Sequence, residues 1–559
     1  MKRTFICLLS IFMIIATLPP FTTSAVSGTP ISTADEFLAM QSGGEYYLTA
    51  DITLPRTYSK PFEGTLNGNG KTLTISAPIF EDFSGKVENL TIEGKVVKTD
   101  EDAAAFALNS SKGFEATNCT NNAKVTVMGY AKYAAGFVGT ALNTTVKFTN
   151  CINNGAVYLD STADEQQRAG GFGGIIDGLF MDGCVNNGNI YVKGSRAVAG
   201  GLVARVAQNK GENNLYIYNS ENNGNVTVED TYIAPDGTPG TGASDAGGIV
   251  GHIGIKDNVA LYQIWGCRNN GNIDALYRVG GLVGYCYASG YDAYIDIQFC
   301  INTGDVTYGR TKAKDGASYY DFASGLVAYT NSAGTTIKYS IDTGKVTLRD
   351  GAITHNTDMI FIGASSADIT QYDLAGVYIL NIDIDPSTYI PQMPPASSTI
   401  YHEPVFADKL YKTTLEDLAS GKVAYEINLA AKKDTYGDSA YKSGFAFYQK
   451  IGDDALPSVD SSRGWVVLSG DTYANGERAV ETTQPEATKS CQGDIPHETT
   501  QAHALTASPE TTSSPETEPP VQTGCGGFSC YAILIVIVCT SCLWKKWTVV
   551  SGQWTERCE

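Results

Sequence analysis

The heptapeptide CINNGAV at residues 151–157 is one of seven similar segments, which we call Asn-Gly phrases, and these segments decide the fold. Each begins with a small residue, continues through Asn or Asp to Gly or Ala, and ends in a β-branched residue. The other copies are CTNNAKV from Cys119, CVNNGNI from Cys184, SENNGNV from Ser220, CRNNGNI from Cys267, CINTGDV from Cys300 and SIDTGKV from Ser340. Successive copies are 32, 33, 36, 47, 33 and 40 residues apart. Self-similarity at this spacing predicts a repeat protein.

A second segment, the Gly phrase, falls between each pair of Asn-Gly phrases. Its copies are AGFVG around Gly136, GGFGG around Gly171, GGLVA around Gly201, GGIVG around Gly248, GGLVG around Gly281 and SGLVA around Gly325. Asn-Gly and Thr-Gly tolerate positive φ, so we expect a tight turn at each Asn-Gly phrase. The alternating β-branched residues after it predict a half-buried strand. Such units bury their apolar face only by stacking, which predicts a β-solenoid.

The two phrases resemble the GLUG-motif repeats of bacterial surface proteins, which belong with the pectate-lyase-like β-helices. GTLNGNGKTLTI at residues 64–75 and YYLTADITL at residues 46–54 are similar to the first coil of those proteins. The resemblance covers roughly residues 30–350. It implies an all-β fold, a right-handed parallel β-helix. The motifs specify a fold and say little about activity.

The order of segments predicts seven parts. They are a signal peptide (1–25), the β-helix (26–390), a Pro-rich linker (391–404), a small α+β module (405–476), a disordered Thr/Pro/Glu-rich stalk (477–524), one transmembrane helix (525–547) and a short cytoplasmic tail (548–559). Lys2 and Arg3 before the apolar residues 5–18 are typical of a signal peptide. Residues 528–544 carry no charge and precede a basic pair at 545–546, as in a membrane anchor with its N-terminus outside.

Short motifs refine this organisation. PPVQTG at residues 519–524 departs from Leu-Pro-x-Thr-Gly, so a retained membrane helix is favoured over attachment to the cell wall. Thr33 and Glu36 form a capping box, which predicts a short helix covering the open end of the first coil. A second box at Thr414 and Asp417 predicts a helix in the small module, which resembles the module that commonly follows GLUG repeats in Gram-positive surface proteins.

The formal charge of −20 argues against nucleic acid and anionic membrane surfaces as partners. Zinc peptidase activity has little support, although some GLUG-repeat proteins are IgA-specific metallopeptidases. The string HETTQAH at residues 497–503 has Gln501 where the second zinc ligand belongs, and it lies in the predicted stalk. We therefore expect neither a metal nor an organic cofactor.

Five cysteines share the first position of the Asn-Gly phrase, where Ser220 and Ser340 stand in two other copies. They are Cys119, Cys151, Cys184, Cys267 and Cys300. A slot that accepts Cys or Ser requires only a small residue, so we predict an internal row of reduced, buried thiols. Disulfides or a metal site are the alternatives at these positions. Cys286 lies outside the row.

A β-helix polysaccharide lyase or glycoside hydrolase is the enzymatic alternative. Such enzymes use clustered carboxylates, as calcium ligands or as an acid/base pair about 5–9.5 Å apart. The candidates are Asp164 with Glu165, Asp292 with Asp296, and Asp383 with Asp385. Each is better explained as a solvated strand or turn position. Ser-His-Asp or Cys-His catalysis is also poorly supported, because neither His252 nor His355 adjoins a nucleophile.

The spacing of the phrases points to a binding surface. The gap from an Asn-Gly phrase to the next Gly phrase ranges from 8 residues (Ile273 to Gly281) to 22 residues (Val226 to Gly248), so insertions gather at one corner of the coils. Repeat proteins often bind at such a corner. The candidate binding residues are Tyr232, Tyr285, Tyr287, Tyr291, Tyr294, Tyr319 and Tyr320. Tyrosine offers rigid amphipathic contact area, although ordinary strand packing also accounts for these residues.

Together these features favour a non-catalytic adhesin of the cell surface, anchored in the plasma membrane by its C-terminal helix. Its expected partner is an extracellular glycan or a host or matrix protein. The carbohydrate-active enzyme and a spacer without a dedicated ligand are the alternatives, because a fold does not determine a function.

Overall fold

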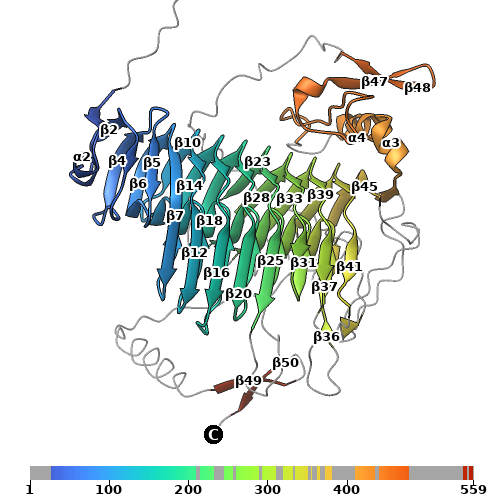
Figure 1. The fold of residues 1–559 in the computed structure, drawn as a ribbon. Helices are drawn as coiled ribbons and strands as arrows, with labels where there is room; N and C mark the ends of the chain where they lie inside the picture. Colours follow the sequence, from blue (N-terminus) through green and yellow to red (C-terminus); the bar gives the residue numbers. More distant parts are fainter. Residues whose placement is uncertain are drawn as a thin grey trace, which may run out of the picture. The chain divides into compact units, whose positions relative to one another are not determined.

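The computed structural model describes residues 27–208, 214–231, 244–255, 260–288, 293–309, 319–330, 334–350, 354–355, 362–364, 372–380, 410–434, 440–477, 546–550 and 553–557. Parallel strands stacked coil upon coil make up most of this part of the chain (Figure 1). Most of them form four sheets, which we call A to D.

Sheet A is the longest sheet. Its strands are β1 (Thr29–Ile31), β2 (Glu45–Leu48), β4 (Phe62–Asn67), β6 (Phe80–Glu88), β9 (Ala107–Asn109), β10 (Phe114–Thr117), β14 (Val138–Thr149), β18 (Gly173–Asp182), β22 (Val203–Gln208), β23 (Leu215–Tyr218), β27 (Val250–Ile255), β28 (Ala260–Trp265), β32 (Val283–Ala288), β33 (Ala293–Gln298), β38 (Val327–Thr330), β39 (Gly334–Lys338), β43 (Ile362–Ala364) and β44 (Tyr372–Ala375).

The other three sheets contain shorter strands. Sheet B consists of β3 (Ile52–Thr53), β5 (Thr72–Ile75), β7 (Thr91–Thr99), β11 (Thr120–Asn121), β15 (Ile152–Asn153), β19 (Val185–Asn186), β24 (Glu221–Asn222), β29 (Arg268–Asn269), β34 (Ile301–Asn302), β40 (Ile341–Asp342), β45 (Val377–Ile379) and β46 (Leu410–Lys412). Sheet C consists of β7 again, β12 (Lys124–Gly129), β16 (Val157–Ser161), β20 (Ile190–Gly194), β25 (Val226–Asp230), β30 (Ile273–Asp274), β35 (Val306–Tyr308) and β41 (Val346–Leu348). Sheet D consists of β8 (Ala103–Ala104), β13 (Tyr133–Ala135), β17 (Arg168–Gly170), β21 (Val198–Gly200), β26 (Asp245–Gly247), β31 (Arg278–Gly280) and β37 (Phe322–Ser324).

One coil shows how the repeat units stack. Between residues 152 and 182 the chain passes through β15, β16, β17 and β18, in sheets B, C, D and A in turn. Each strand pairs in parallel with its counterpart one coil later: Ile152 with Val185, Val157 with Ile190, Arg168 with Val198, and Gly173 with Val203. The predicted all-β architecture of stacked parallel strands is therefore confirmed.

A buried row of side-chain amides runs through the Asn-Gly phrases. Its fully buried members, each at the third position of a phrase, are Asn121, Asn153, Asn186, Asn222, Asn269 and Asn302. From Asn121 to Asn269, each Nδ2 donates to Oδ1 of the next member at 2.7–2.8 Å. Each also donates to the carbonyl two residues ahead in its own turn. Asp342 ends the row, accepting from Asn302 at 2.9 Å. Because these amides find partners only in this register, the row aligns successive coils.

The glycine of the Asn-Gly phrase has a different role from the predicted one. The prediction of positive φ at this turn is wrong, because positive φ occurs directly before each phrase, at Asn118, Asn150, Gly183, Asn219, Gly266, Phe299 and Tyr339. The phrase glycines instead lie against the preceding coil. A Cβ on Gly188 would overlap the carbonyl oxygen of Gly155, and one on Gly224 would overlap that of Gly188. Glycine is required here for the close approach of coils.

The first position of the phrase holds a row of buried thiols, as predicted. Cys119, Cys151, Cys184, Cys267, Cys300 and the separate Cys286 are all free and buried. The Sγ of Cys151 donates to the carbonyl of Thr149 at 3.4 Å. At the equivalent position, the Oγ of Ser220 donates to the carbonyl of Tyr218 at 2.7 Å. A hydroxyl in this slot therefore finds the same backbone acceptor as a thiol.

Replacing Cys184 by Ser is expected to change the free energy of unfolding by less than about 1 kcal/mol, because Ser220 and Ser340 already fill the slot without an unpaired hydroxyl. Cys184→Leu, which overpacks the same position, should cost about 1–3 kcal/mol. Urea unfolding of both variants measures the difference. A thiol titration of the unfolded, unreduced chain should find these cysteines free, and quantitative disulfides would contradict the packing role.

A short helix closes the first coil. α2 (Ala34–Leu38) begins with the predicted capping box: Oγ1 of Thr33 accepts from the backbone of Glu36 at 3.2 Å, and Oε2 of Glu36 accepts from the backbone of Thr33 at 3.1 Å. Phe37 is fully buried, and its ring lies 5.7 Å from that of Phe80. The expected end cap is thus present, next to β2 and β4 in Figure 1.

The small module packs directly on the coils before it. It contains α3 (Leu415–Ala419), α4 (Lys422–Lys433), a 3-10 turn (Ser461–Arg463) and the hairpin β47 (Trp465–Ser469) and β48 (Thr472–Gly476). Phe299, Tyr339 and Trp265 of the solenoid share one buried apolar cluster with Val423 and Ile427 of α4. The strand β46, which the sequence assigned to the module, pairs with β45 and extends sheet B. The module is therefore structurally continuous with the solenoid.

Several predicted segments lie outside the described residues: the signal peptide (1–25), the linker (391–404), the stalk from 478 to 524 and the apolar tract up to 545. Among the described residues, no helix combines the length and apolar character needed to cross a membrane. Lys546 and Trp547, predicted to end the transmembrane helix, belong instead to β49 (Lys546–Val550). This strand forms an antiparallel hairpin with β50 (Gln553–Arg557), in a separate compact unit that spans Thr488–Glu559.

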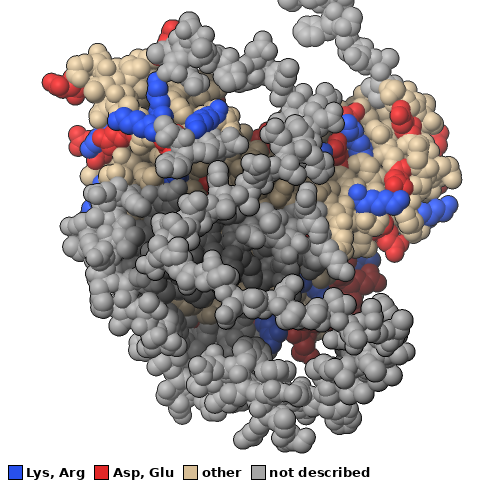
Figure 2. Space-filling view, turned by 180° about the vertical axis from the view of Figure 1, so that it is seen from behind, with Lys and Arg blue, Asp and Glu red and all other residues tan. Residues whose placement is uncertain are grey.

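The described surface mixes charges of both signs. Figure 2 shows Lys and Arg beside Asp and Glu in the described regions visible at the upper left and the right. Ion pairs join these charges across coils: Nζ of Lys112 lies 2.8 Å from Glu63, and Nζ of Lys147 lies 2.9 Å from Glu115. All four side chains are about half exposed, so each pair contributes little to stability.

Candidate functional site

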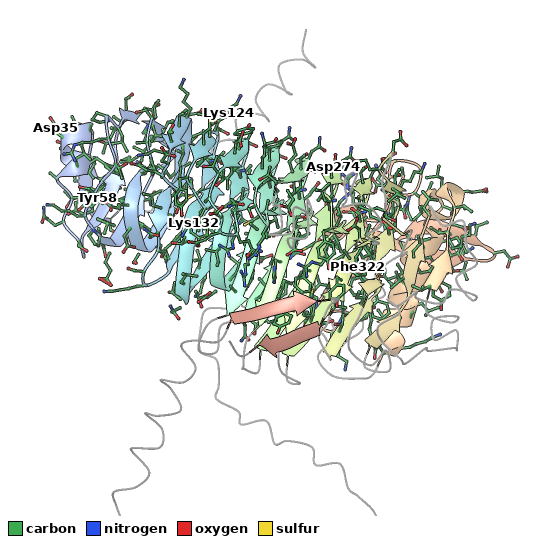
Figure 3. The ribbon with its side chains drawn as sticks, turned by 90° about the horizontal axis from the view of Figure 1, so that it is seen from below. Asp35, Tyr58, Lys124, Lys132, Asp274 and Phe322 are labelled. Carbon is green, nitrogen blue, oxygen red and sulfur yellow. The ribbon has the colours of Figure 1, made fainter. Side chains whose placement is uncertain are left out.

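Two rows of side chains that point away from the core flank the Gly phrases. The first, on sheet D three residues before the central glycine, is Tyr133, Arg168, Val198, Asp245, Arg278 and Phe322. The second, on sheet A four residues after it, is Thr140, Ile175, Arg205, His252, Tyr285 and Tyr329. Both rows alternate with core residues such as Ala246 and Ile253. Lys132, next to Tyr133, and Phe322 mark the two ends of the first row in Figure 3.

The Gly phrase bends the chain between the two rows. A Cβ on Gly248 would overlap the carbonyl oxygen of Gly281 and the side chain of Asn269. The glycine therefore lets the corner pack tightly on the amide row, as the small residues of this phrase suggest. The bend brings sheet D side chains into contact with sheet A side chains of the same coil.

Asp245 lies at the centre of the contacts between the rows. It is fully buried, with Oδ2 lying 2.9 Å from Nδ1 of His252 and Oδ1 lying 2.5 Å from Nε of Arg278. Neither contact has aligned hydrogen-bond geometry, and the contact with Arg278 is an ion pair. A buried carboxylate is tolerated only when a cation compensates its charge, and Arg278 supplies that cation.

Aromatic rings surround the guanidinium of Arg278. Its Cζ lies 3.5 Å from the ring centroid of Tyr285, 4.8 Å from that of Tyr277 and 5.9 Å from that of Tyr329. The ring of Tyr285 also contacts the imidazole ring of His252 edge-on, with 4.6 Å between the two ring centroids. Cation–π contacts at these distances hold a desolvated arginine in place. We call Asp245, His252, Arg278, Tyr285 and Tyr329 the Gly-corner cluster.

The protonation states in the cluster follow from burial and pairing. Burial lowers the pKa of His252 to about 4, although Asp245 acts in the opposite direction. His252 is therefore neutral at pH 7. Burial acts to lower the pKa of Arg278 as well, but Asp245, Tyr277 and Tyr285 outweigh it and raise that pKa overall. At neutral pH, Arg278 thus carries the positive charge that balances Asp245.

The cluster lies between two columns of chain insertions. One column joins sheets C and D, with the long segments between β25 and β26 and between β35 and β37. The other divides sheet A: β14 and β18 are continuous, whereas the next coils use strand pairs such as β22 with β23 and β27 with β28. The cluster therefore belongs to coils whose sequences carry both kinds of insertion.

Of the predicted binding tyrosines, Tyr285 and Tyr287 are fully described and lie together on β32. Their ring centroids are 6.1 Å apart, and both side chains are half-buried. Tyr294 belongs to β33, and Tyr319 and Tyr320 form β36 (Tyr319–Tyr320); the side chains of these three lie outside the described part. Tyr232 and Tyr291 also lie outside the described residues.

The carboxylates weighed as catalytic groups take part in other contacts where they are described. Asp296 accepts hydrogen bonds from Nε1 of Trp265 at 3.0 Å and from Nε2 of Gln298 at 2.9 Å. Glu165, next to the exposed Asp164, pairs with Lys132 at 2.7 Å. The remaining candidates, Asp292, Asp383 and Asp385, lie outside the described residues. Within the described part, no group of three or more His, Cys, Asp or Glu side chains could hold a metal ion.

From the sequence, His252 was weighed as a catalytic histidine and set aside. Asp245, Arg278, Arg205 and Arg168 were not predicted as site residues. Asp245 lies within the 22-residue gap between Val226 and Gly248, and it begins β26. A positional signal was nevertheless present. All five residues stand three before or four after the central glycine of a Gly phrase. Aligning the repeats on that glycine would have collected them into two columns.

Comparisons with known proteins are sparse. No protein-family model and no curated protein matches the chain. A solved structure of a candidate immunoglobulin A1 protease from Bacteroides ovatus is 16% identical, with 56% of this chain and 86% of that chain covered and a TM-score of 0.29. An IgA1 protease structure is 13% identical, with 78% of this chain and 31% of that chain covered and a TM-score of 0.36. Likenesses this distant carry no argument about activity, and the GLUG resemblance stays a prediction from the repeat phrases.

Proposed function

We propose that this chain is a non-catalytic surface protein of a bacterium that binds an extracellular glycan or a host or matrix protein at the Gly-corner cluster. The observation that carries the proposal is the half-buried ring of Tyr285, which lies over the buried Arg278 and beside the buried His252, between two columns of insertions. Aromatic rings beside a fixed cation are typical of recognition surfaces. Right-handed coiling, export by residues 1–25 and anchoring by residues 525–547 are part of the same proposal.

Binding explains the cluster better than general acid–base or nucleophilic catalysis. Both oxygens of Asp245 contact His252 or Arg278, and the carboxylate is fully buried. A group held in this way positions its neighbours and is not exposed to a substrate. Arg278 is likewise enclosed by aromatic rings, so the parts that face outward are tyrosine rings and hydroxyls.

Replacing Tyr287 by Ala is expected to weaken binding by roughly three- to tenfold, the effect of losing one aromatic contact. The measurement is adhesion of the full chain to an array of glycans and matrix proteins. Tyr191→Ala is the matched control, because Tyr191 stacks on Tyr158 at 4.7 Å on sheet C, away from the cluster. Thermal unfolding checks that both variants are folded. An equal loss of binding in both variants would mean that the ligand does not bind at the Gly corner.

A polysaccharide lyase is the second candidate, favoured by one observation: a neutral imidazole stands beside an arginine and a tyrosine. In β-elimination a base removes the proton next to a uronate carboxylate, a C=C bond forms, and the glycosidic C–O bond breaks as the leaving oxygen takes up a proton. Ultraviolet absorbance of the unsaturated product would detect this reaction with hyaluronate. Product formation that disappears in His252→Gln would replace the binding proposal by this one.

A further inference from the structure

Arg168 and Arg205, which we call the arginine pair, lie side by side in the two rows. Arg168 begins β17 on sheet D, and Arg205 lies in β22 on sheet A. Nη2 of Arg168 and Nη1 of Arg205 both donate to Oε1 of Gln166, each at 2.7 Å. Because they share one acceptor oxygen, the two guanidinium groups are close neighbours. Arg168 also donates to the hydroxyl of Tyr133 at 3.2 Å.

The arginine pair lacks a counter-ion among the described residues. No described carboxylate forms an ion pair with either guanidinium, and Nε of each is buried without a hydrogen-bond partner. Burial and repulsion from Arg205 lower the pKa of Arg168 to about 10. Burial also lowers the pKa of Arg205, against attraction from Asp245 and Asp177, and Glu165 acts in the same direction as these on the pKa of Arg168. Two like charges in a desolvated setting are costly unless another group neutralises them.

Other cations of the solenoid differ from the pair in this respect. Arg278 has Asp245, Lys132 has Glu165, and Lys112 has Glu63 within ion-pair distance. The chain as a whole carries a formal charge of −20, so acidic partners for two more arginines are plentiful in its composition. The sequence nevertheless places the uncharged Gln166 between them.

We propose that the arginine pair binds an oxyanion, a carboxylate or a sulfate, carried by an acidic glycan. The inference rests on the proposed binding function and names the class of ligand. Planar guanidinium groups present paired N–H donors that match both oxyanions, and neutralisation by the ligand would offset the repulsion within the pair. The net negative charge of the chain repels an acidic ligand from the rest of the surface. We therefore expect such a ligand to bind at the arginine pair.

A polysaccharide fits the surroundings of the pair better than a compact anion. The rows continue from Arg205 to His252, Tyr285 and Tyr329 in steps of one coil, about 4.8 Å each, which suits a linear polymer lying along the stack. Gly254 lies beside Arg205 and His252. A Cβ there would lie 3.3 Å from Nε2 of His252 and 3.5 Å from Nη2 of Arg205.

The test measures binding of the full chain to four polymers: hyaluronate, which carries carboxylates; dextran sulfate; neutral dextran; and polyglutamate. We expect binding to one or both acidic glycans, weakened by salt. The double variant Arg168→Gln with Arg205→Gln should reduce that affinity roughly ten- to hundredfold. The matched control is Lys95→Gln with Lys124→Gln, which removes two charges from exposed register partners on sheet C. It should leave the affinity unchanged.

The outcomes separate this inference from the proposed function. Hyaluronate and dextran sulfate distinguish a carboxylate ligand from a sulfate ligand. Binding that neutral dextran shares, or that the arginine variant retains, overturns the inference and leaves the binding function standing. A preference for polyglutamate replaces the glycan by an acidic protein segment. Failure to bind any of the four polymers overturns the inference, whereas the proposed function is overturned only if the chain also fails to bind every member of the array of glycans and matrix proteins. If the glutamine variant unfolds, Arg168→Lys with Arg205→Lys keeps the charge without the planar donors, and unchanged binding there would overturn the inference.

Discussion

Replacing Asp342 by Asn is expected to raise the free energy of unfolding by roughly 4 kcal/mol at about pH 8 and to change it little at about pH 4. Asp342 ends the buried amide row and is 1% exposed. Its Oδ1 accepts from Nδ2 of Asn302 at 2.9 Å and from the backbone of Gly344 at 3.1 Å. Burial raises its pKa to about 7, even though both hydrogen bonds act in the opposite direction.

The direction of the effect follows from the two protonation equilibria. An aspartate with the ordinary pKa of 3.8 loses its proton in the unfolded chain at a lower pH than in the folded protein. Stability is therefore fully present below about pH 4, falls as the pH rises to about 7, and stays reduced above that. Roughly three pH units at 1.36 kcal/mol each give about 4 kcal/mol. The introduced amide has no proton to lose, and it can donate to the carbonyl of Gly344, as the six asparagines donate to the carbonyl two residues ahead.

Urea unfolding of both proteins at about pH 4 and about pH 8 measures the difference. Asp471→Asn, at an exposed turn of the small module, serves as the control and should change neither value. An equal gain at both pH values would mean that better packing, and not the buried charge, is responsible. No gain at the higher pH would mean that the carboxylate reaches solvent.

The repeat phrases predicted the stacking of the solenoid because register in parallel sheets depends on residues at fixed intervals. Asn186 and Asn222 show why: each amide bonds its own turn and the next coil, so spacing in the sequence maps directly onto stacking in space. The conformation of the turn was not predictable in the same way. Gly188 looked like a positive-φ turn residue, but the constraint on it is the carbonyl of Gly155, which local sequence does not reveal.

The boundary between the solenoid and the small module was also not predictable from local sequence. A Pro-rich stretch predicted a separate domain, whereas Phe299 and Tyr339 already indicated a covered surface. They stand directly before their Asn-Gly phrases, where Asn118, Asn150 and Asn219 stand in other coils. Large aromatic residues at a position that is otherwise polar are buried only if another element packs on them, as α4 does here.

The candidate site shows the same limit. Tyrosines near the insertions led to Tyr285 and Tyr287, because aromatic residues next to variable loops are informative without a structure. The charged partners were not found, since Asp245 and Arg278 are 33 residues apart in the sequence. They meet only because β26 and β31 are adjacent in sheet D. Long-range charge pairs of this kind depend on register, which the individual motifs do not report.

Replacing Arg278 by Gln should lower the free energy of unfolding by about 3–5 kcal/mol, the cost of leaving a buried carboxylate without its cation. Asp245 is fully buried, and His252, its other contact, is neutral at pH 7 and cannot balance the charge. Loss of the cation–π contact with Tyr285 adds to the effect. Urea unfolding at pH 7 measures the loss.

Two further variants show whether pairing, and not burial alone, causes this loss. Asp245→Asn combined with Arg278→Gln removes both charges and should recover part of the stability, with a coupling energy of about 0.5–3 kcal/mol in a double-mutant cycle. Arg168→Gln, which removes a half-buried arginine without a described counter-ion, should cost little or raise stability. If Arg168→Gln proved as damaging as Arg278→Gln, the two arginines would share a structural role. The arginine pair would then no longer stand out as a place reserved for an acidic ligand.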